Sequence, residues 1–159
     1  MKWFVISNII VIVAVLVATQ YVFSKEESAM PAGGVAEVNS PADHIKEDQI
    51  KAYEKKVEIS FDKKTRFVKF VDTNSMDPVL DAETNAIEVI PDSSDEINKG
   101  DIISYKSSRS PIPVIHRVVE VNKDENGWFA IVKGDNNPEP DPEKVRFHQI
   151  NGVVVALFY

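Results

Sequence analysis

Seven short runs rich in β-branched and aromatic residues fill the chain from residue 57 to its last residue, and they restrict the fold more than any other feature. They lie at 57–61, 67–71, 86–90, 102–105, 114–121, 128–132 and 153–159. Clusters of Pro, Asp, Asn, Ser and Gly separate several of them, as turns separate strands. This pattern predicts a mainly β fold, an all-β sandwich or barrel with long loops. The segments VIHRVVEV and GWFAIVKG form the best hairpin candidate.

The N-terminal segment has a different character. From Trp3 to Phe23 the sequence holds no charged side chain. As a helix, these 21 residues would span ~31 Å, close to the hydrocarbon thickness of a bilayer. Because Lys2 and the amino terminus precede the run, that end is expected in the cytoplasm and the rest of the chain outside. The segment predicts an uncleaved, single-pass anchor. The alternative is a cleaved signal peptide with residues 9–18 as its apolar core.

The stretch between these two parts is polar. Residues 24–40 are small and polar and include Pro and Gly, which is typical of a tether. A Ser-Pro start at Ser40 and a loose apolar face over 45–57 predict a short charged helix, or stalk. A solvated charged linker explains the same residues. The predicted organisation is therefore an anchor at 1–23, a linker and stalk helix at 24–56, and a β-rich domain at 57–159.

Composition excludes several classes of function. The chain has no cysteine, so a disulfide scaffold, a thiolate zinc site, an iron–sulfur cluster and a cysteine nucleophile are all ruled out. The formal net charge of −7 argues against nucleic acid as a partner, because phosphate binding needs clustered Lys and Arg.

Two single residues of the β-rich domain stand where side chains can do chemistry. Ser75 follows one strand and precedes a turn that contains Pro78, so it is expected at an exposed strand end, within reach of a substrate carbonyl. His116 lies inside the most apolar strand, where partial burial keeps an imidazole uncharged and able to act as a general base. Each also has an ordinary explanation, Ser75 as a turn residue and His116 as a structural histidine.

A third segment, KGDNNPEPD at 133–141, is an acidic loop. Asp135 begins a spacing like that of a calcium loop, but Pro140 stands where the sharp turn requires Gly and Arg146 where the bidentate Glu belongs. The loop is then either a solvated turn or the source of the carboxylate that orients a catalytic histidine, from Asp135 or Asp141. Ser, His and Asp in this order are the parts needed for acyl transfer.

Four ordered segments carry a family resemblance: NSMDPVL, KGDIISY, VIHRVVEV and VKGDNNPEPD. Together they resemble the type I signal peptidases, and within them the archaeal and endoplasmic-reticulum branch, in which His replaces the bacterial catalytic Lys. The resemblance covers roughly residue 67 to the C terminus. Two positions depart from the family pattern. Asn74 stands where Gly or Ser is usual, and Val79 where Thr or Ser is common.

The resemblance implies a role for each matching residue. Ser75 becomes the nucleophile and His116 the general base. Asp141 is the first choice for the carboxylate that holds His116, and Asp135 is a second acidic residue needed at the site; which of the two orients the imidazole stays open. Met76 and Pro78 would shape the substrate cleft.

The function so implied is that of a membrane-bound serine endopeptidase that removes N-terminal signal peptides from secreted preproteins, with no metal or organic cofactor. Its partners would be preprotein signal peptides, membrane lipid through the N-terminal helix, and accessory subunits of a secretion machinery. Its catalytic domain would stand outside the cell membrane. Two alternatives stay open: a noncatalytic, membrane-tethered β domain, and a protease of the same fold that cleaves few proteins or only itself.

Overall fold

The computed structural model describes residues 38–159, which form a unit of their own. The anchor predicted at 1–23 and residues 24–37 of the tether predicted at 24–40 lie outside the described residues. Within 38–159, no helix is both long enough and apolar enough to span a bilayer.

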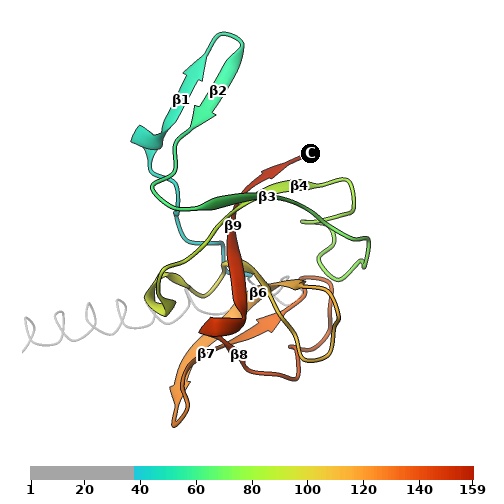
Figure 1. Cartoon of the computed structure of the whole chain (residues 1–159). Helices are drawn as coiled ribbons and strands as arrows, with labels where there is room; N and C mark the ends of the chain where they lie inside the picture. Colours follow the sequence, from blue (N-terminus) through green and yellow to red (C-terminus); the bar gives the residue numbers. More distant parts are fainter. Residues whose placement is uncertain (1–37) are drawn as a thin grey trace, which may run out of the picture. The chain divides into compact units, whose positions relative to one another are not determined.

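Residues 38–159 are mainly β, as predicted (Figure 1). The strands are β1 (Ile50–Tyr53), β2 (Lys56–Ile59), β3 (Thr65–Lys69), β4 (Asn85–Val89), β5 (Ile102–Tyr105), β6 (Val114–Asp124), β7 (Gly127–Lys133), β8 (Val145–Arg146) and β9 (Ile150–Phe158). Short 3-10 turns lie at η1 (Glu47–Gln49), η2 (Ser94–Glu96) and η3 (Phe147–Gln149). Each of the seven predicted runs overlaps a strand, and the predicted hairpin is the antiparallel pair β6–β7.

The larger sheet is antiparallel and has the order β3-β4-β9-β5-β6-β7-β8. The last strand, β9, lies inside it, between β4 and β5, and joins β3 and β4 to the rest of the sheet. The register shifts at Ile87/Glu88, Ser104/Tyr105 and Val118/Glu120. Such irregularities bend a strand and increase its twist, which lets the sheet curl around its own side chains.

Both faces of the curled sheet are packed. Strand alternation sends Ile103 and Tyr105 of β5 into one apolar cluster, together with Val153 of β9. It sends Ile102 of β5 and Val154 of β9 into a second cluster. The second cluster also holds two residues from the loop after β3, and that loop contains the predicted nucleophile.

The helix predicted between residues 40 and 57 is not present in the structure. A 3-10 turn at η1 is followed by β1 and β2, which form a separate two-stranded sheet. The register pairs Ile50 with Ile59 and Ala52 with Val57, so the apolar residues alternate along the strands with a period of two. The spacing that indicated a loose helical face therefore fits a hairpin as well. The two-residue strand β8 is a further element that the sequence pattern did not indicate.

The segment before η1, predicted as part of the stalk, is bound to the domain. Asp101, fully buried, accepts hydrogen bonds from the Ala42 N–H at 2.8 Å and from His44 Nε2 at 2.9 Å. Gly100 has a φ of +102°, and a Cβ there would lie 2.0 Å from the Ser40 carbonyl oxygen. Glycine is thus required both by the backbone conformation and by the close approach of the strap, which we define as residues 38–46.

The His44–Asp101 pair makes the stability of the domain depend on pH. The hydrogen bond to Asp101 raises the pKa of His44 above its ordinary 6.5, against the opposing effect of burial. Burial alone would raise the pKa of Asp101, but the hydrogen bonds from His44 and from two backbone N–H groups lower it overall. The contribution of His44 to the free energy of unfolding is therefore complete below about pH 6.5, and it is lost as the pH rises through the raised pKa of His44. The contribution of Asp101 to the free energy of unfolding is complete above about pH 4, and it is lost as the pH falls through the lowered pKa of Asp101.

We expect His44→Ala to lower the free energy of unfolding by about 1–2 kcal/mol near pH 6, because a hydrogen bond to a charged, buried group is lost. The loss should be smaller at pH 8, because a larger share of the wild-type imidazole is neutral there than at pH 6. Thermal unfolding followed by circular dichroism at both values measures it, with exposed Ser93→Ala as the control. A loss that is equal at pH 6 and pH 8 would contradict the role of the ion pair.

Candidate active site

Ser75 begins a tight turn in the loop between β3 and β4. Asn74 has a φ of +55°, a left-handed conformation that Asn tolerates better than most residues, and this explains an Asn where the family pattern has Gly or Ser. Met76, only 4% exposed, fixes the turn in the second core cluster, and its carbonyl oxygen accepts from the Val79 and Leu80 N–H groups. The turn therefore holds the Ser75 side chain half-buried at the edge of the core.

The acidic loop after β7 packs directly on this turn. The Asn136 N–H donates to the Ser75 carbonyl oxygen at 3.0 Å, and the Asn136 side chain donates to the Asn74 carbonyl oxygen at 2.9 Å. A Cβ on Gly134 would lie 2.5 Å from the Ser75 carbonyl oxygen, so glycine is needed for the two backbones to approach. The segments NSM and KGDNN, far apart in the sequence, thus form one structural unit.

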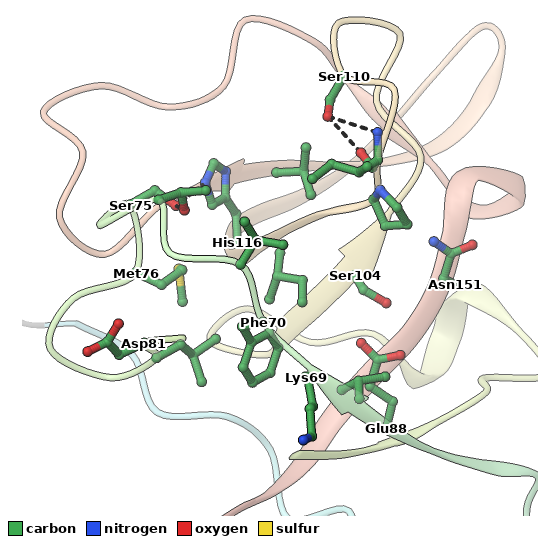
Figure 2. Close-up of a pocket in the computed structure, with 18 of the residues that line it drawn as sticks. Lys69, Phe70, Ser75, Met76, Asp81, Glu88, Ser104, Ser110, His116 and Asn151 are labelled. Atoms are coloured by element: carbon green, nitrogen blue, oxygen red, sulfur yellow. Dashed lines mark hydrogen bonds between the residues drawn. The ribbon is translucent and has the colours of Figure 1, made fainter. Parts of the chain in front are cut away.

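His116 connects Ser75 to a carboxylate. The imidazole, 7% exposed, lies on β6 with Nε2 3.2 Å from Ser75 Oγ and Nδ1 2.8 Å from Asp141 Oδ2. Figure 2 shows Ser75 and His116 side by side at one end of the cleft. Since a carboxylate only accepts, Nδ1 carries the proton it donates to Asp141, and Nε2 is left to accept the proton of the Ser75 hydroxyl. The Thr73 hydroxyl lies 3.1 Å from Ser75 Oγ.

Asp141 is held in an ionised state. Burial alone would raise the pKa of Asp141, but the hydrogen bonds from His116 and from the Tyr105 hydroxyl outweigh it and lower the pKa below its usual range. Burial, and then the bond to Asp141, raise the pKa of Tyr105, so its hydroxyl stays protonated and donates. A charged Asp141 favours the imidazolium form that His116 adopts after it takes a proton.

Asp135, the second acidic residue, does not contact the imidazole. It accepts a bidentate pair of hydrogen bonds from Arg117, at 2.8 Å to Nε and 2.6 Å to Nη2. Arg117 in turn donates to the carbonyl oxygens of Gly100 and, at 3.4 Å, Asn39. Both side chains of the pair are at most 10% exposed. Through Arg117, Asp135 therefore connects the acidic loop to β6 and to the strap. Arg117 follows His116 on β6, so its side chain lies on the opposite face of the strand from the imidazole.

A cleft of about 480 Å³ runs away from Ser75 and His116. Met76 forms part of its wall, whereas Pro78 is exposed and is not among the residues that line it. Much of the rest of the wall is apolar, and includes Val68, Phe70, Leu80, Ile112, Val114 and Ile115. Within residues 38–159, no three His, Asp or Glu side chains are grouped so that they could hold a metal ion.

Two residues of the site had no role in the sequence analysis. Tyr105 holds Asp141, and Arg117 holds Asp135. Tyr105 ends the KGDIISY segment and Arg117 follows His116, so both stood within segments that carry the family resemblance. The sequence does not reveal how β5 pairs with β6. In the structure Ile103 pairs with His116, and Tyr105, two residues further along β5, therefore lies on the same face as the imidazole.

Comparisons with known proteins agree with the resemblance. No family model matches the chain. An uncharacterized protein of Methanocaldococcus jannaschii is 42% identical over 65 residues, which is 37% of this chain and 32% of that protein. The signal peptidase complex catalytic subunit sec11 of Schizosaccharomyces pombe is 39% identical over 67 residues, 37% of this chain and 35% of that protein. The human signal peptidase complex catalytic subunit SEC11C is 40% identical over 48 residues, 30% of this chain and 25% of that protein.

The chain thus spans about a third or less of the length of the curated relatives it matches. Within these matched segments, the resemblance to signal peptidases of the archaeal and endoplasmic-reticulum branch is confirmed.

Proposed function

We propose that this chain is a membrane-bound serine endopeptidase that removes signal peptides from preproteins. The observation that carries the proposal is the chain of hydrogen bonds from Ser75 through His116 to Asp141, at the end of an apolar cleft. The similarity to proteins named as catalytic subunits of signal peptidase complexes supports the same reaction class. A noncatalytic domain would not require a serine, an imidazole and an ionised carboxylate in this order.

The proposed reaction has two halves. Ser75 Oγ attacks the carbonyl carbon of the scissile peptide bond while its proton passes to His116 Nε2, which gives a tetrahedral intermediate. The C–N bond then breaks, and His116 gives the proton to the departing amine, leaving an ester between Ser75 and the N-terminal fragment. Water, deprotonated by His116, attacks the ester, and Ser75 regains its hydrogen when the acid is released. Asp141 stabilises the imidazolium in both halves.

The negative oxygen of each intermediate needs donors. The backbone N–H of Ser75 lies on the turn beside the nucleophile and is one donor in this proposal. The Thr73 hydroxyl, 3.1 Å from Ser75 Oγ, is close enough to supply a second. Donors of this kind act on charge that develops only during the reaction, which is why each is worth several kcal/mol of barrier in acyl-transfer enzymes.

The location of the enzyme is part of the proposal. Residues 3–23 have the length and apolar character of a membrane span, and Lys2 precedes them. We place the N terminus in the cytoplasm and residues 38–159 outside, where secreted preproteins emerge. Accessory subunits are expected as partners, since the fungal and human relatives are named as subunits of a signal peptidase complex.

The proposal is tested with full-length protein in membrane vesicles and a secreted preprotein that carries Ala at the first and third positions before the predicted cut. Analysis by intact mass should show one cut after the small residue. Replacing the first Ala by Trp should slow cleavage at least 100-fold, because the resemblance implies a small residue at this position. The same Trp substitution ten residues downstream serves as the control and should change the rate little.

Two results would overturn the proposal. Cleavage of the Ala and Trp preproteins at equal rates would exclude a signal-peptidase specificity. An absence of cleavage in vesicles that hold the folded protein, with membranes of the native host showing none either, would favour the noncatalytic β domain.

A further inference from the structure

The end of the cleft away from Ser75 is polar, although the walls between are apolar. Glu88, Ser104 and Asn151 lie at this end, and Figure 2 shows the Glu88 and Ser104 side chains on the far side of Phe70 from Ser75. Glu88 is 1% exposed and Ser104 is 4% exposed, so both are buried polar residues that also line a cavity.

The register of the sheet places these two residues on the same face. Glu88 on β4 pairs with Val154 of β9, and Ser104 on β5 pairs with Gly152 of β9. Because Gly152 and Val154 are two residues apart, Glu88 and Ser104 project from the same face, on the two sides of β9. A Cβ on Gly152 would lie 2.7 Å from Glu88 Oε2, so the missing side chain is what makes room for the carboxylate.

Each of the two residues has an oxygen without a partner. Glu88 Oε2 accepts from Arg66 at 3.0 Å, but Glu88 Oε1 and Ser104 Oγ have no hydrogen-bond partner within residues 38–159 and are shielded from solvent. Buried polar atoms are nearly always paired in folded proteins, because an unpaired one keeps the full cost of its desolvation. A pair of unsatisfied atoms on one cavity wall is the arrangement expected of a binding site whose ligand supplies the missing bonds.

The charges around this end favour a neutral ligand. Arg66 and Lys69 are cationic, Glu88 is anionic, and all three line the cleft, whereas Asp81 lies near Met76, toward the Ser75 end (Figure 2). Arg66 already neutralises Glu88, so an added cation would meet the Arg66 charge and an added anion would meet the unpaired oxygen of Glu88. A hydroxyl or carboxamide can donate to Glu88 Oε1 and share a second bond with Ser104 Oγ, which both donates and accepts.

We propose that Glu88 and Ser104 form a specificity subsite for a neutral, hydrogen-bonding side chain of the bound peptide, a Ser, Thr, Asn or Gln a few residues from the scissile bond. The inference rests on the proposed function in taking the ligand to be a peptide whose scissile bond lies at Ser75. The subsite would require a polar side chain at one position of the peptide, whereas the apolar walls of the cleft select the other side chains by shape and apolar character. Sites that bond a hydroxyl discriminate strongly against the analogue that lacks it, because the protein groups are left unpaired.

The test compares peptides that carry Thr or Val, which have the same shape, at one position at a time. Synthetic peptides spanning a signal-peptide cleavage site are made with this exchange at each position from six before the cut to three after it. Binding to full-length Ser75→Ala protein in detergent micelles is measured by fluorescence anisotropy, and cleavage by full-length wild-type protein is measured by mass. At one position the Thr peptide should bind about tenfold more tightly than the Val peptide.

Adding Ser104→Ala or Glu88→Gln to the Ser75→Ala protein should bring this ratio close to one. Ser60→Ala, an exposed serine after β2, should leave it at about tenfold. Ser104→Ala removes a hydroxyl that has no hydrogen-bond partner, so this variant should fold. The test can therefore rely on Ser104→Ala alone if Glu88→Gln does not fold. Equal binding of Thr and Val peptides at every position, or a ratio that neither variant changes, would overturn the subsite.

The two proposals fail in different ways. Cleavage without any preference for Thr overturns the subsite and leaves the peptidase function standing. A Thr preference in binding, lost in Ser104→Ala, without cleavage by wild-type protein supports the subsite and overturns the peptidase function. An absence of binding by any peptide overturns the subsite as well.

Discussion

Replacing Ser75 by Ala should abolish preprotein cleavage, with a loss of at least about 10⁴-fold in kcat/KM, because the atom that forms the acyl bond is removed. The fold should persist, since Ser75 is only half-buried and its turn is fixed by Met76 and by backbone hydrogen bonds. Cleavage under single-turnover conditions, with enzyme in excess over preprotein and analysis by intact mass, measures the chemical step directly.

The double variant Ser75→Ala/His116→Ala provides a sharper check. If the two residues act as one unit, the double variant should be no slower than Ser75→Ala alone, because His116 has no hydroxyl left to deprotonate. Ser93→Ala, an exposed serine between β4 and β5, is the matched control and should cleave at the wild-type rate. Cleavage by Ser75→Ala equal to wild type would exclude Ser75 as the nucleophile, and with it the proposed mechanism.

Local sequence patterns were sufficient for most of the sheet. The seven predicted runs overlap strands because each is short and rich in β-branched and aromatic residues, and this signal lies within a single strand. The failures occurred where the local signal is ambiguous. Ile45, Ile50, Tyr53 and Val57 suggested a loose helical face, but Ile50 and Val57 pair with Ile59 and Ala52 in a hairpin, and β8 is too short to show a period.

The candidate site could be assembled from the sequence only through the family resemblance, and the roles of its two aspartates only through the fold. Asp135 and Asp141 belong to one loop, and nothing in their spacing tells which one reaches His116. The structure brings them to different partners because Gly134 and Asn136 hold the start of the loop on the Ser75 turn, while the Asp141 N–H bonds back to the Val132 carbonyl oxygen at 2.8 Å. Such contacts depend on tertiary packing, which no local pattern records.

Asp141→Asn should therefore lower kcat by about 10³- to 10⁴-fold with little change in stability. The amide introduced by this exchange can donate to His116 Nδ1, which then carries no proton, so Nε2 is protonated and cannot accept the proton of Ser75. A neutral amide also cannot stabilise the imidazolium. In the wild type, Asp141 Oδ2 accepts from both His116 and the Tyr105 hydroxyl. An amide nitrogen in that position can donate one N–H to His116 Nδ1 and the other to the Tyr105 hydroxyl oxygen, so the packing of the site is kept. Single-turnover cleavage and thermal unfolding of the same full-length samples measure the two effects.

Asp135→Asn should show the opposite pattern, and the contrast separates the two aspartates. It breaks a buried, bidentate ion pair and leaves the Arg117 charge with carbonyl partners only, which should destabilise the domain by about 3 kcal/mol. At a temperature where this variant remains folded, its kcat should stay within about tenfold of wild type, because the hydrogen bonds of His116 are intact. If Asp135→Asn loses kcat as severely as Asp141→Asn while still folded, Asp135 acts in the chemistry as well as in holding Arg117.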